Sequence, residues 1–353
     1  FVRFHVRLTI NTPQQIRRTP IPLRTPTCSP CANPTTTVIA PAVLRTIPEG
    51  IYAAEDFLED DGVGGGPHRL ACTVRSVGGR LRVDFRGTDP ALPTGLNAPL
   101  AVTHSAVVYV VACLVAAALD DEQALLNAGT FRPVDVRVPE GCLLNPTPGM
   151  AVAAGNVETS QRVVDLLLAA LEPALAHLIP AASQGTMNNL LIGFASADLP
   201  PGAGRGRTHY ETMAGGGGAG PRGPGADAIQ VHMTNTRNTP VEALERAYPM
   251  RVRALRLRPG TGGAGRWRGG DGIERDLEVL ADATLSLITE RRVSAPWGLE
   301  GGEAGAVGEN WLLPGGQEGA AIRLPDKCTL RVHAGDVVRV VDQSEPPGCE
   351  APG

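Results

Sequence analysis

The chain has 353 residues, of which 42% are hydrophobic, 19% charged and only 4% aromatic. Its net charge of −4 and pI near 6.0 argue against nucleic acid as a main partner, and its aromatic content argues against a base-stacking platform. Seven scattered cysteines in so long a chain indicate reduced thiols, and the length predicts one large or two ordinary domains.

Residues 1–46 are rich in Pro, Thr and Arg, and no acidic residue occurs before Glu49. Because they lack apolar periodicity, we expect a disordered or non-homologous leader. The same balance is typical of an organelle transit peptide, and this alternative stays open beside a cytoplasmic location.

Residues 47–200 are predicted to form a lobe of strands and long apolar helices. The stretch "HRLACTVRSVGGRLRVDFRGT" indicates two strands joined by a turn at two glycines. The uncharged segment 98–119 is long enough to cross a bilayer, but Thr103, His104 and Ser105 interrupt it. We therefore expect a buried helix, with Asn97 as its N-cap, and no membrane partner.

A second, amphipathic helix is predicted in "GNVETSQRVVDLLLAALEPALAHL", with a kink at Pro173. A loop-rich linker at 200–207 then separates the first lobe from residues 208–345. That second lobe is predicted to be β-rich, with strands in "RVRALRLR", "IERDLEVL" and "TLSLITER". The fold class is accordingly mixed α/β (α+β), in two lobes.

The stretch "AIQVHMTNTRNTPVEALERAYP" predicts a strand, a polar run and a short helix. Thr239 and Glu242 have the spacing of a capping box around Pro240. Helix capping does not need Asn235 or Arg237. The polar run is equally compatible with an anion-binding site and with a loop that satisfies its own backbone.

Two further stretches combine polar side chains with glycine. "ASQGTMNN" contains Ser183 and Asn188, and "HYET" places Glu211, a possible general base, before the glycine-rich run 215–220. These glycines either let backbone amides approach a ligand or form tight turns. The chain has no Walker phosphate loop, HExxH or Gly-x-Ser-x-Gly motif, and its seven histidines are isolated in sequence.

Successive motifs resemble the hydantoinase B/oxoprolinase family in order and spacing, from about residue 47 to 341. Among them are "GNVETSQRVVD", "ASQGTMNNLLIG", "HYETMAGGGGAGPRG", "TNTRNTPVE" and "ITERRVSAPWGLEGGEAGA". The resemblance is greatest to the 5-oxoprolinase branch and its bacterial hydantoinase relatives. It implies ATP-dependent opening of a small cyclic amide, such as 5-oxo-L-proline to L-glutamate, with ATP bound by a separate hydantoinase A-type subunit or domain.

With this resemblance in view, the predicted catalytic residues are Glu211 and His232. The predicted substrate-binding residues are Ser183, Asn188, Asn235 and Arg237. Family members also carry an N-terminal region with side chains that resemble metal ligands, and residues 1–46 do not match it. We therefore expect no cofactor or metal on this chain alone and a divalent metal only in a complete subunit. The alternative function is a non-catalytic scaffold that binds the partner.

Overall fold

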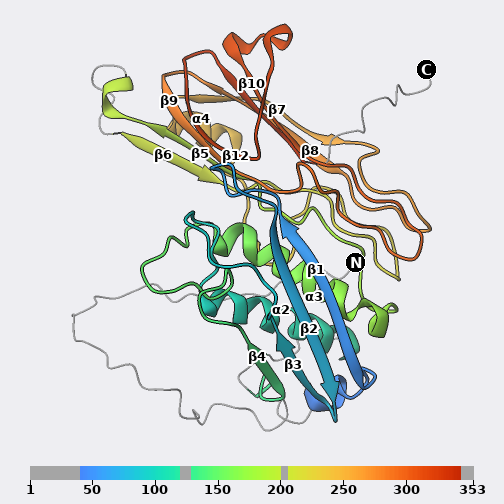
Figure 1. Ribbon diagram of the computed structural model, residues 1–353. Coiled ribbons are helices and arrows are strands. Elements are labelled where there is room, and N and C mark those ends of the chain that lie inside the picture. The colour runs from blue at the N-terminus through green and yellow to red at the C-terminus, as the bar shows by residue number, and fades with distance from the viewer. Residues whose placement is uncertain (1–39, 120–128, 200–205, 343–353) are drawn as a thin grey trace, which may run out of the picture.

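The computed structural model describes residues 40–119, 129–199 and 206–342 (Figure 1). These residues form the predicted mixed α/β fold, and its strands lie in three sheets. One sheet packs with helices in the first lobe, and the other two form the β-rich second lobe.

The first lobe is a four-stranded sheet with two helices on one face. Its elements are β1 (Gly50–Leu58), β2 (His68–Val77), β3 (Arg80–Asp84), α2 (Leu100–Leu119), β4 (Val134–Arg137) and α3 (Ser160–Leu175). The strands lie in the order β1-β2-β3-β4; the first three are antiparallel, and β4 runs parallel to β3. The predicted hairpin turn between β2 and β3 is confirmed.

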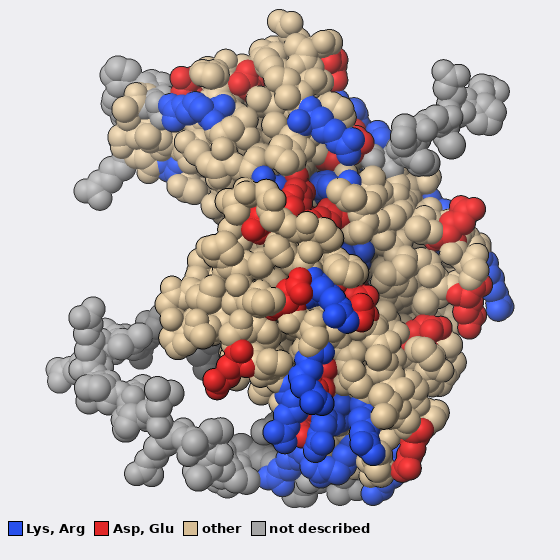
Figure 2. Space-filling model, in the orientation of Figure 1, with Lys and Arg blue, Asp and Glu red and all other residues tan. Residues whose placement is uncertain are grey.

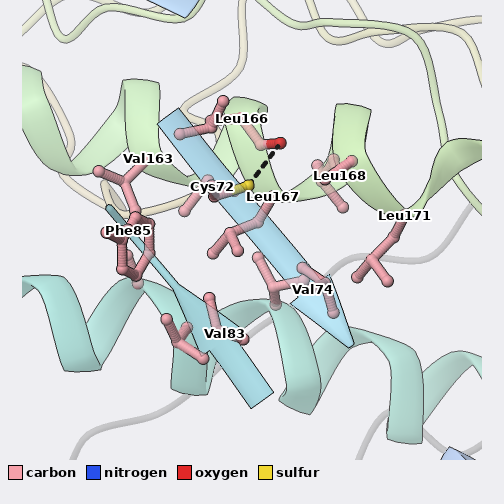
Figure 3. Close-up of a cluster of buried hydrophobic side chains, with 14 of the residues drawn as sticks. Cys72, Val74, Val83, Phe85, Val163, Leu166, Leu167, Leu168 and Leu171 are labelled. Atoms are coloured by element: carbon pink, nitrogen blue, oxygen red, sulfur yellow. Dashed lines mark hydrogen bonds between the residues drawn. The ribbon is translucent and has the colours of Figure 1, made fainter. Parts of the chain in front are cut away.

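Buried apolar side chains hold this sheet to its helices. Figure 3 shows Val74, Val83 and Phe85 on the strand side of the cluster and Val163 and Leu167 on α3. These side chains are at most 2% exposed, so each contributes about 1.5–3 kcal/mol through burial. The cluster fixes α3, whose first turns carry the charged residues described below.

The α2 helix packs one face into the same core, through residues that include Val107, Val111 and Leu114. By length and composition alone, Leu100–Ala118 could cross a membrane; 44% of that window is buried inside the fold. The expected cap is wrong. The Asn97 side chain instead forms hydrogen bonds with the backbone of Leu92, Thr94 and Ala151. Its amide thereby joins two neighbouring loops and is not free to cap the helix.

The leader prediction is wrong at its C-terminal end. Residues 40–44 are helical, and Ala40, Leu44 and Ile47 are buried in the first core. The helical stripe 40, 44, 47 is too short to stand out beside the prolines around it. Positions 1–39 lie outside the described residues.

The second lobe packs a five-stranded sheet (β11-β10-β13-β8-β7) against a four-stranded one (β12-β9-β5-β6). The strands are β5 (Asn189–Phe194), β6 (Arg207–Glu211), β7 (Met250–Arg258), β8 (Gly272–Val279), β9 (Ala283–Ile288), β10 (Glu309–Leu313), β11 (Ile322–Leu324), β12 (Lys327–Val332) and β13 (Val337–Val341). A short helix, α4 (Val241–Ala247), precedes β7, and 3-10 turns occupy Ser196–Asp198, Pro314–Gly316 and Glu318–Ala320.

The predicted β7, β8 and β9 are confirmed, but the expected boundary at 200–207 is misplaced. β5 pairs with β6 and β9, and Leu190, Ile192 and Phe194 belong to the second core. The second lobe therefore already includes β5, from Asn189 onward. Linker composition misleads here because 200–207 connects two paired strands of one sheet.

A candidate active site around His232

His232 lies in an irregular segment. The strand expected at 228–232 is absent, and a single bridge joins Ile229 to Gly215. His232 itself has a positive φ of 53°, which is uncommon outside glycine. Gln161 holds this conformation, because its amide donates to Val231 O (3.0 Å) and accepts from Met233 N (2.9 Å).

The imidazole of His232 lies among residues from three other segments. Its Nε2 is 2.9 Å from Ser183 Oγ and 3.2 Å from Asp165 Oδ1 on α3. The ring of Tyr109, from α2, meets the imidazole edge to face, with 5.9 Å between centroids. The structure thus brings two predicted residues, Ser183 and His232, together around an unpredicted carboxylate.

These contacts differ from a Ser-His-Asp relay, in which serine and carboxylate contact opposite ring nitrogens. Ser183 and Asp165 both approach Nε2. Ser183 Oγ makes the hydrogen bond to Nε2, and Asp165 Oδ1 lies within ion-pair distance of the same nitrogen without a hydrogen bond of its own. The Asp165 charge favours a proton on Nε2, and a protonated Nε2 cannot remove the Ser183 proton. Within the described part of the chain, the polar contacts of the His232 ring are made through Nε2 and not through Nδ1, and the whole side chain is 12% exposed. Nδ1 is therefore the ring atom available for proton transfer.

Asp165 is fully buried yet charged. Burial would raise its pKa, but His232 and the guanidinium groups of Arg291 and Arg162 hold the pKa of Asp165 below its usual range. Arg291 Nη2 lies 3.0 Å from Asp165 Oδ2. Gly185 leaves room for this ion pair, since a Cβ at that position would lie 2.6 Å from Arg291 Nε and 2.7 Å from Asp165 Oδ2. The carboxylate is thus fixed on both sides.

A second layer of charge lies behind Asp165. Arg162, also fully buried, is 2.9 Å from Glu290 and 3.3 Å from Asp56. Lys327 Nζ reaches Glu290 at 2.6 Å. Because these groups come from β1, α3, β12 and the loop after β9, the ionic cluster joins the two lobes.

Glu158 lies beside this cluster and differs from its ion-paired carboxylates, because its pKa is raised. It accepts hydrogen bonds from Thr186, Met187 N and Asn189, all through Oε1, and Oε2 has no partner among the described residues. Burial and the nearby Glu290 charge raise the pKa of Glu158 to about 8. Glu158 is therefore mainly protonated at neutral pH.

Asn188, a predicted substrate-binding residue, is buried, with φ at +48°. Its amide donates to Asp342 Oδ1 (3.0 Å) and accepts from Arg292 (2.8 Å). Burial raises the pKa of Asp342 to about 6. Both polar ends of the Asn188 side chain are therefore bonded to other protein groups, and its predicted contact with substrate stays a prediction.

Glu211, the other predicted catalytic residue, lies in a separate cluster. Its carboxylate is 3.0 Å from Arg275 Nε and 3.4 Å from His209 Nε2, and it accepts from Asn238 Nδ2 at 3.1 Å. The Glu211 side chain is 5% exposed and that of Arg275 1%. No hydrogen bond or ion pair joins this cluster to His232 within the described residues.

Asn235 and Arg237 are exposed, and their side chains make no hydrogen bond or ion pair within the described ranges. The capping-box prediction beside them is wrong. α4 begins at Val241 after Pro240, which takes the cap position, and no side chain bonds the first turn. The extended backbone of Pro240 (ψ 139°) moves Thr239 one residue outside the cap.

The glycine-rich stretches pack against one another. Backbone hydrogen bonds link 181–184 to 216–219, 217 to 226 and 270, 263 to 269, and 182 to 297. A Cβ on Gly218 would lie 1.8 Å from Ala181 O, and one on Gly225 2.0 Å from Gly217 O. Close contact between backbone segments, rather than turns or a ligand, therefore requires these glycines.

A cavity of about 350 Å³ borders this glycine bundle, with Trp267, Trp297 and Ala182 in its wall. Neither Ser183 nor His232 lines it, so the cavity is separate from the His232 cluster. Among the described residues, no group of three or more His, Cys, Asp or Glu side chains could hold a metal ion.

Sequence reasoning passed over the residues that surround His232. Glu158, Arg162 and Asp165 stand at spacings of four and three residues, just before α3 and in its first turns. Such spacing places them on one helical face, where three charges amid buried leucines mark a polar cluster. This pattern of charges could have been read from the sequence. No sequence pattern indicated that Arg291 and Gln161 are their partners.

Comparison with known proteins agrees with this architecture. The profile described as hydantoinase B/oxoprolinase matches residues 34–344. The chain belongs to this family. The matched region also includes residues 34–46, so that part of the expected leader is homologous to the family.

The chain is 38% identical to 5-oxoprolinase 1 of Arabidopsis thaliana over 287 residues, 81% of this chain and 20% of that protein. It is also 38% identical to 5-oxoprolinase of Saccharomyces cerevisiae, over 81% of this chain and 22% of that protein. The fold resembles the ATP-dependent caprolactamase of Pseudomonas jessenii, with a TM-score of 0.71, 23% identity, and coverage of 88% of this chain and 53% of that one. The chain thus spans between about a fifth and about half of the length of these proteins.

Proposed function

We propose that this chain supplies the hydrolytic part of an ATP-dependent cyclic-amide hydrolase that converts 5-oxo-L-proline to L-glutamate. The observation that carries the proposal is the Asp165–His232 pair, a buried charged carboxylate that faces a partly exposed imidazole. Membership in the family and 38% identity to a 5-oxoprolinase support the substrate class.

In this proposal His232 Nδ1 is the general base. It accepts a proton from water as the water oxygen bonds to the carbonyl carbon of the ring. The Asp165 carboxylate stabilises the imidazolium that forms, because the charges lie 3.2 Å apart. When the ring C–N bond breaks, the imidazolium returns the proton to the departing nitrogen. A base of this kind contributes about 100- to 10,000-fold to a rate.

The remaining residues position the reactants. Ser183 Oγ and the Gln161 amide fix the ring and its backbone. Arg237 is exposed and unpaired within the described residues, so its guanidinium is free to bind the substrate carboxylate with two parallel hydrogen bonds. Asn235 offers a neutral donor beside it. Glu211 has no part in this mechanism.

ATP belongs to a hydantoinase A-type subunit or domain, which phosphorylates the amide oxygen. Cleavage of the C–N bond then leaves an acyl phosphate, and a second water molecule releases inorganic phosphate from it to give the carboxylate. The residues described here do not bind it in this proposal, and no step depends on a metal. We place the assembled enzyme in the cytoplasm, without a membrane or nucleic-acid partner.

The test combines the purified chain with a recombinant hydantoinase A-type subunit, ATP and one of three lactams: 5-oxoproline, hydantoin or caprolactam. Ring opening is followed by chromatography and ADP by a coupled assay. We expect 5-oxoproline to be opened only when both proteins are present, and no ATP hydrolysis by the chain alone. Complex formation without opening of any lactam would instead favour the scaffold function.

A further inference from the structure

The first sheet has one face without a partner. α2 and α3 pack on its inner face, and no described element covers the outer one (Figure 1). Ile51 on β1 is 66% exposed and Val77 on β2 is 48% exposed, although both are large and apolar. Exposed apolar residues grouped with polar ones are typical of protein-binding surfaces.

Arginines surround these two residues. Figure 2 shows a group of basic side chains over the lower end of this sheet, where β2 ends and β3 begins. The strand register places Arg75 opposite both Ile51 and Arg82, and Arg80 opposite Val77. These side chains therefore form one continuous basic and apolar surface.

The charges on this surface are not balanced internally. Asp135 pairs with Arg82 at 2.9 Å and also with Arg137 at 3.1 Å. Arg75 and Arg80 are exposed and form no ion pair or hydrogen bond within the described part of the chain. Glu49 adds an exposed carboxylate at the turn between β2 and β3, where it accepts a hydrogen bond from Gly78 N, and two arginines remain unpaired among the described residues of this surface although the net charge of the protein is −4.

The pairing of Arg75 with Arg82 carries a local cost. Like charges directly opposite each other on neighbouring strands destabilise a sheet. A bound carboxylate between them would remove this repulsion. The repulsion between Arg75 and Arg82 is therefore a local cost that an acidic partner would remove.

We infer that the outer face of the first sheet, centred on Arg75, Arg80, Ile51 and Val77, docks an acidic protein surface. The occupant is the ATP-binding A-type subunit, and this identification rests on the proposed function. A second copy of the chain does not fit, because a two-fold interface would place these arginines against each other. Nucleic acid fits poorly, because apolar side chains occupy the centre of the patch and aromatic side chains for base stacking are lacking.

The experiment uses titration calorimetry at two salt concentrations to measure how tightly the full chain binds a recombinant hydantoinase A-type subunit. The test variant is R75E/R80E, and R75Q/R80Q is a milder second variant. R246E is the matched control, since Arg246 is exposed on α4 in the other lobe and unpaired within the described residues. Melting temperatures establish that every variant is folded.

We expect R75E/R80E to weaken binding at least tenfold and R75Q/R80Q to weaken it less, while R246E binds as wild type does. Higher salt should weaken wild-type binding and reduce the difference between variants. Wild-type binding that R75E/R80E leaves unchanged would overturn this inference and leave the proposed function standing. No wild-type binding would count against both. If the wild-type chain binds duplex DNA or anionic vesicles and R75E/R80E does not, the inference of a protein partner is overturned.

Discussion

His232 and Glu211 show how similar residues serve different ends. Each belongs to a histidine–carboxylate pair, His232 with Asp165 at 3.2 Å and His209 with Glu211 at 3.4 Å. The Glu211 pair lies in the second lobe, with Arg275 and Asn238 to complete it. Among the described residues, His232 makes polar contacts through Nε2 alone, and its side chain remains partly exposed. Access to a ring nitrogen, rather than residue type, separates the candidate base from a structural ion pair.

The largest effect on stability is expected from Glu211→Ala. Removal of this carboxylate leaves the buried Arg275 guanidinium without its counter-charge, which costs about 3–5 kcal/mol of unfolding free energy. Denaturant titration measures this loss. A change below about 1 kcal/mol would show that the Glu211 cluster is not structural and would remove the contrast with His232.

Glu158→Gln should alter the pH dependence of stability. The pKa of Glu158 is raised from 4.5 to about 8 on folding, so the folded state binds the extra proton between these values. Wild-type stability from this group is therefore full below pH 4.5 and declines as pH rises to about 8. The variant has no such proton, so its stability relative to wild type should rise by on the order of 3 kcal/mol from about pH 5 to about pH 9.

Denaturant titrations of both proteins across that range isolate the Glu158 contribution, because other titrating groups are common to both. A constant difference across the whole range would mean that Glu158 is ionised throughout in the folded state.

Gln161→Ala tests how His232 is positioned. The variant loses the two hydrogen bonds to residues 231 and 233, each with a net contribution of about 0.5–1.5 kcal/mol. We expect kcat of the assembled enzyme to fall about tenfold or more, with KM little changed, because the base is misplaced. Gln161→Glu keeps the acceptor for Met233 N and should fall between. Equal rates in all three proteins would mean that the two Gln161 hydrogen bonds do not affect catalysis.

The smallest effect is expected from Thr239→Ala. With no side-chain bond to the first turn of α4, this change should alter stability by less than about 0.5 kcal/mol. A loss of about 1 kcal/mol, typical of a helix cap, would restore the capping box. Thermal melts of the variant and wild type decide this.

Local patterns predicted the elements well and the site only in part. Alternating Leu81, Val83 and Phe85 identified β3, because the two-residue repeat of a strand is recognisable within five residues. Residues 189–194 were placed in the first lobe without a predicted strand, since their sequence does not show that β5 pairs with β6 and β9. Thr239 fitted a capping box in sequence, yet the turn at Pro240 excludes that geometry.

The site depends on long-range contacts that no local pattern encodes. Ser183 and His232 were identified separately, and only the fold brings Asp165 to the same nitrogen. Glu211 was chosen because a carboxylate precedes glycines, but its partner Arg275 comes from a different sheet. A carboxylate in sequence does not reveal whether a buried cation already neutralises it.

One measurement tests the central claim most directly: steady-state turnover of 5-oxoproline by His232→Asn and Glu211→Gln, each assembled with its A-type partner at a temperature where both variants are folded. The account predicts that His232→Asn loses about 100-fold or more in kcat. Glu211→Gln, which keeps the shape of the side chain, should stay within about fivefold of wild type, because its cost falls on stability. Full activity in His232→Asn together with an inactive but folded Glu211→Gln would contradict it and move the active site to the second lobe.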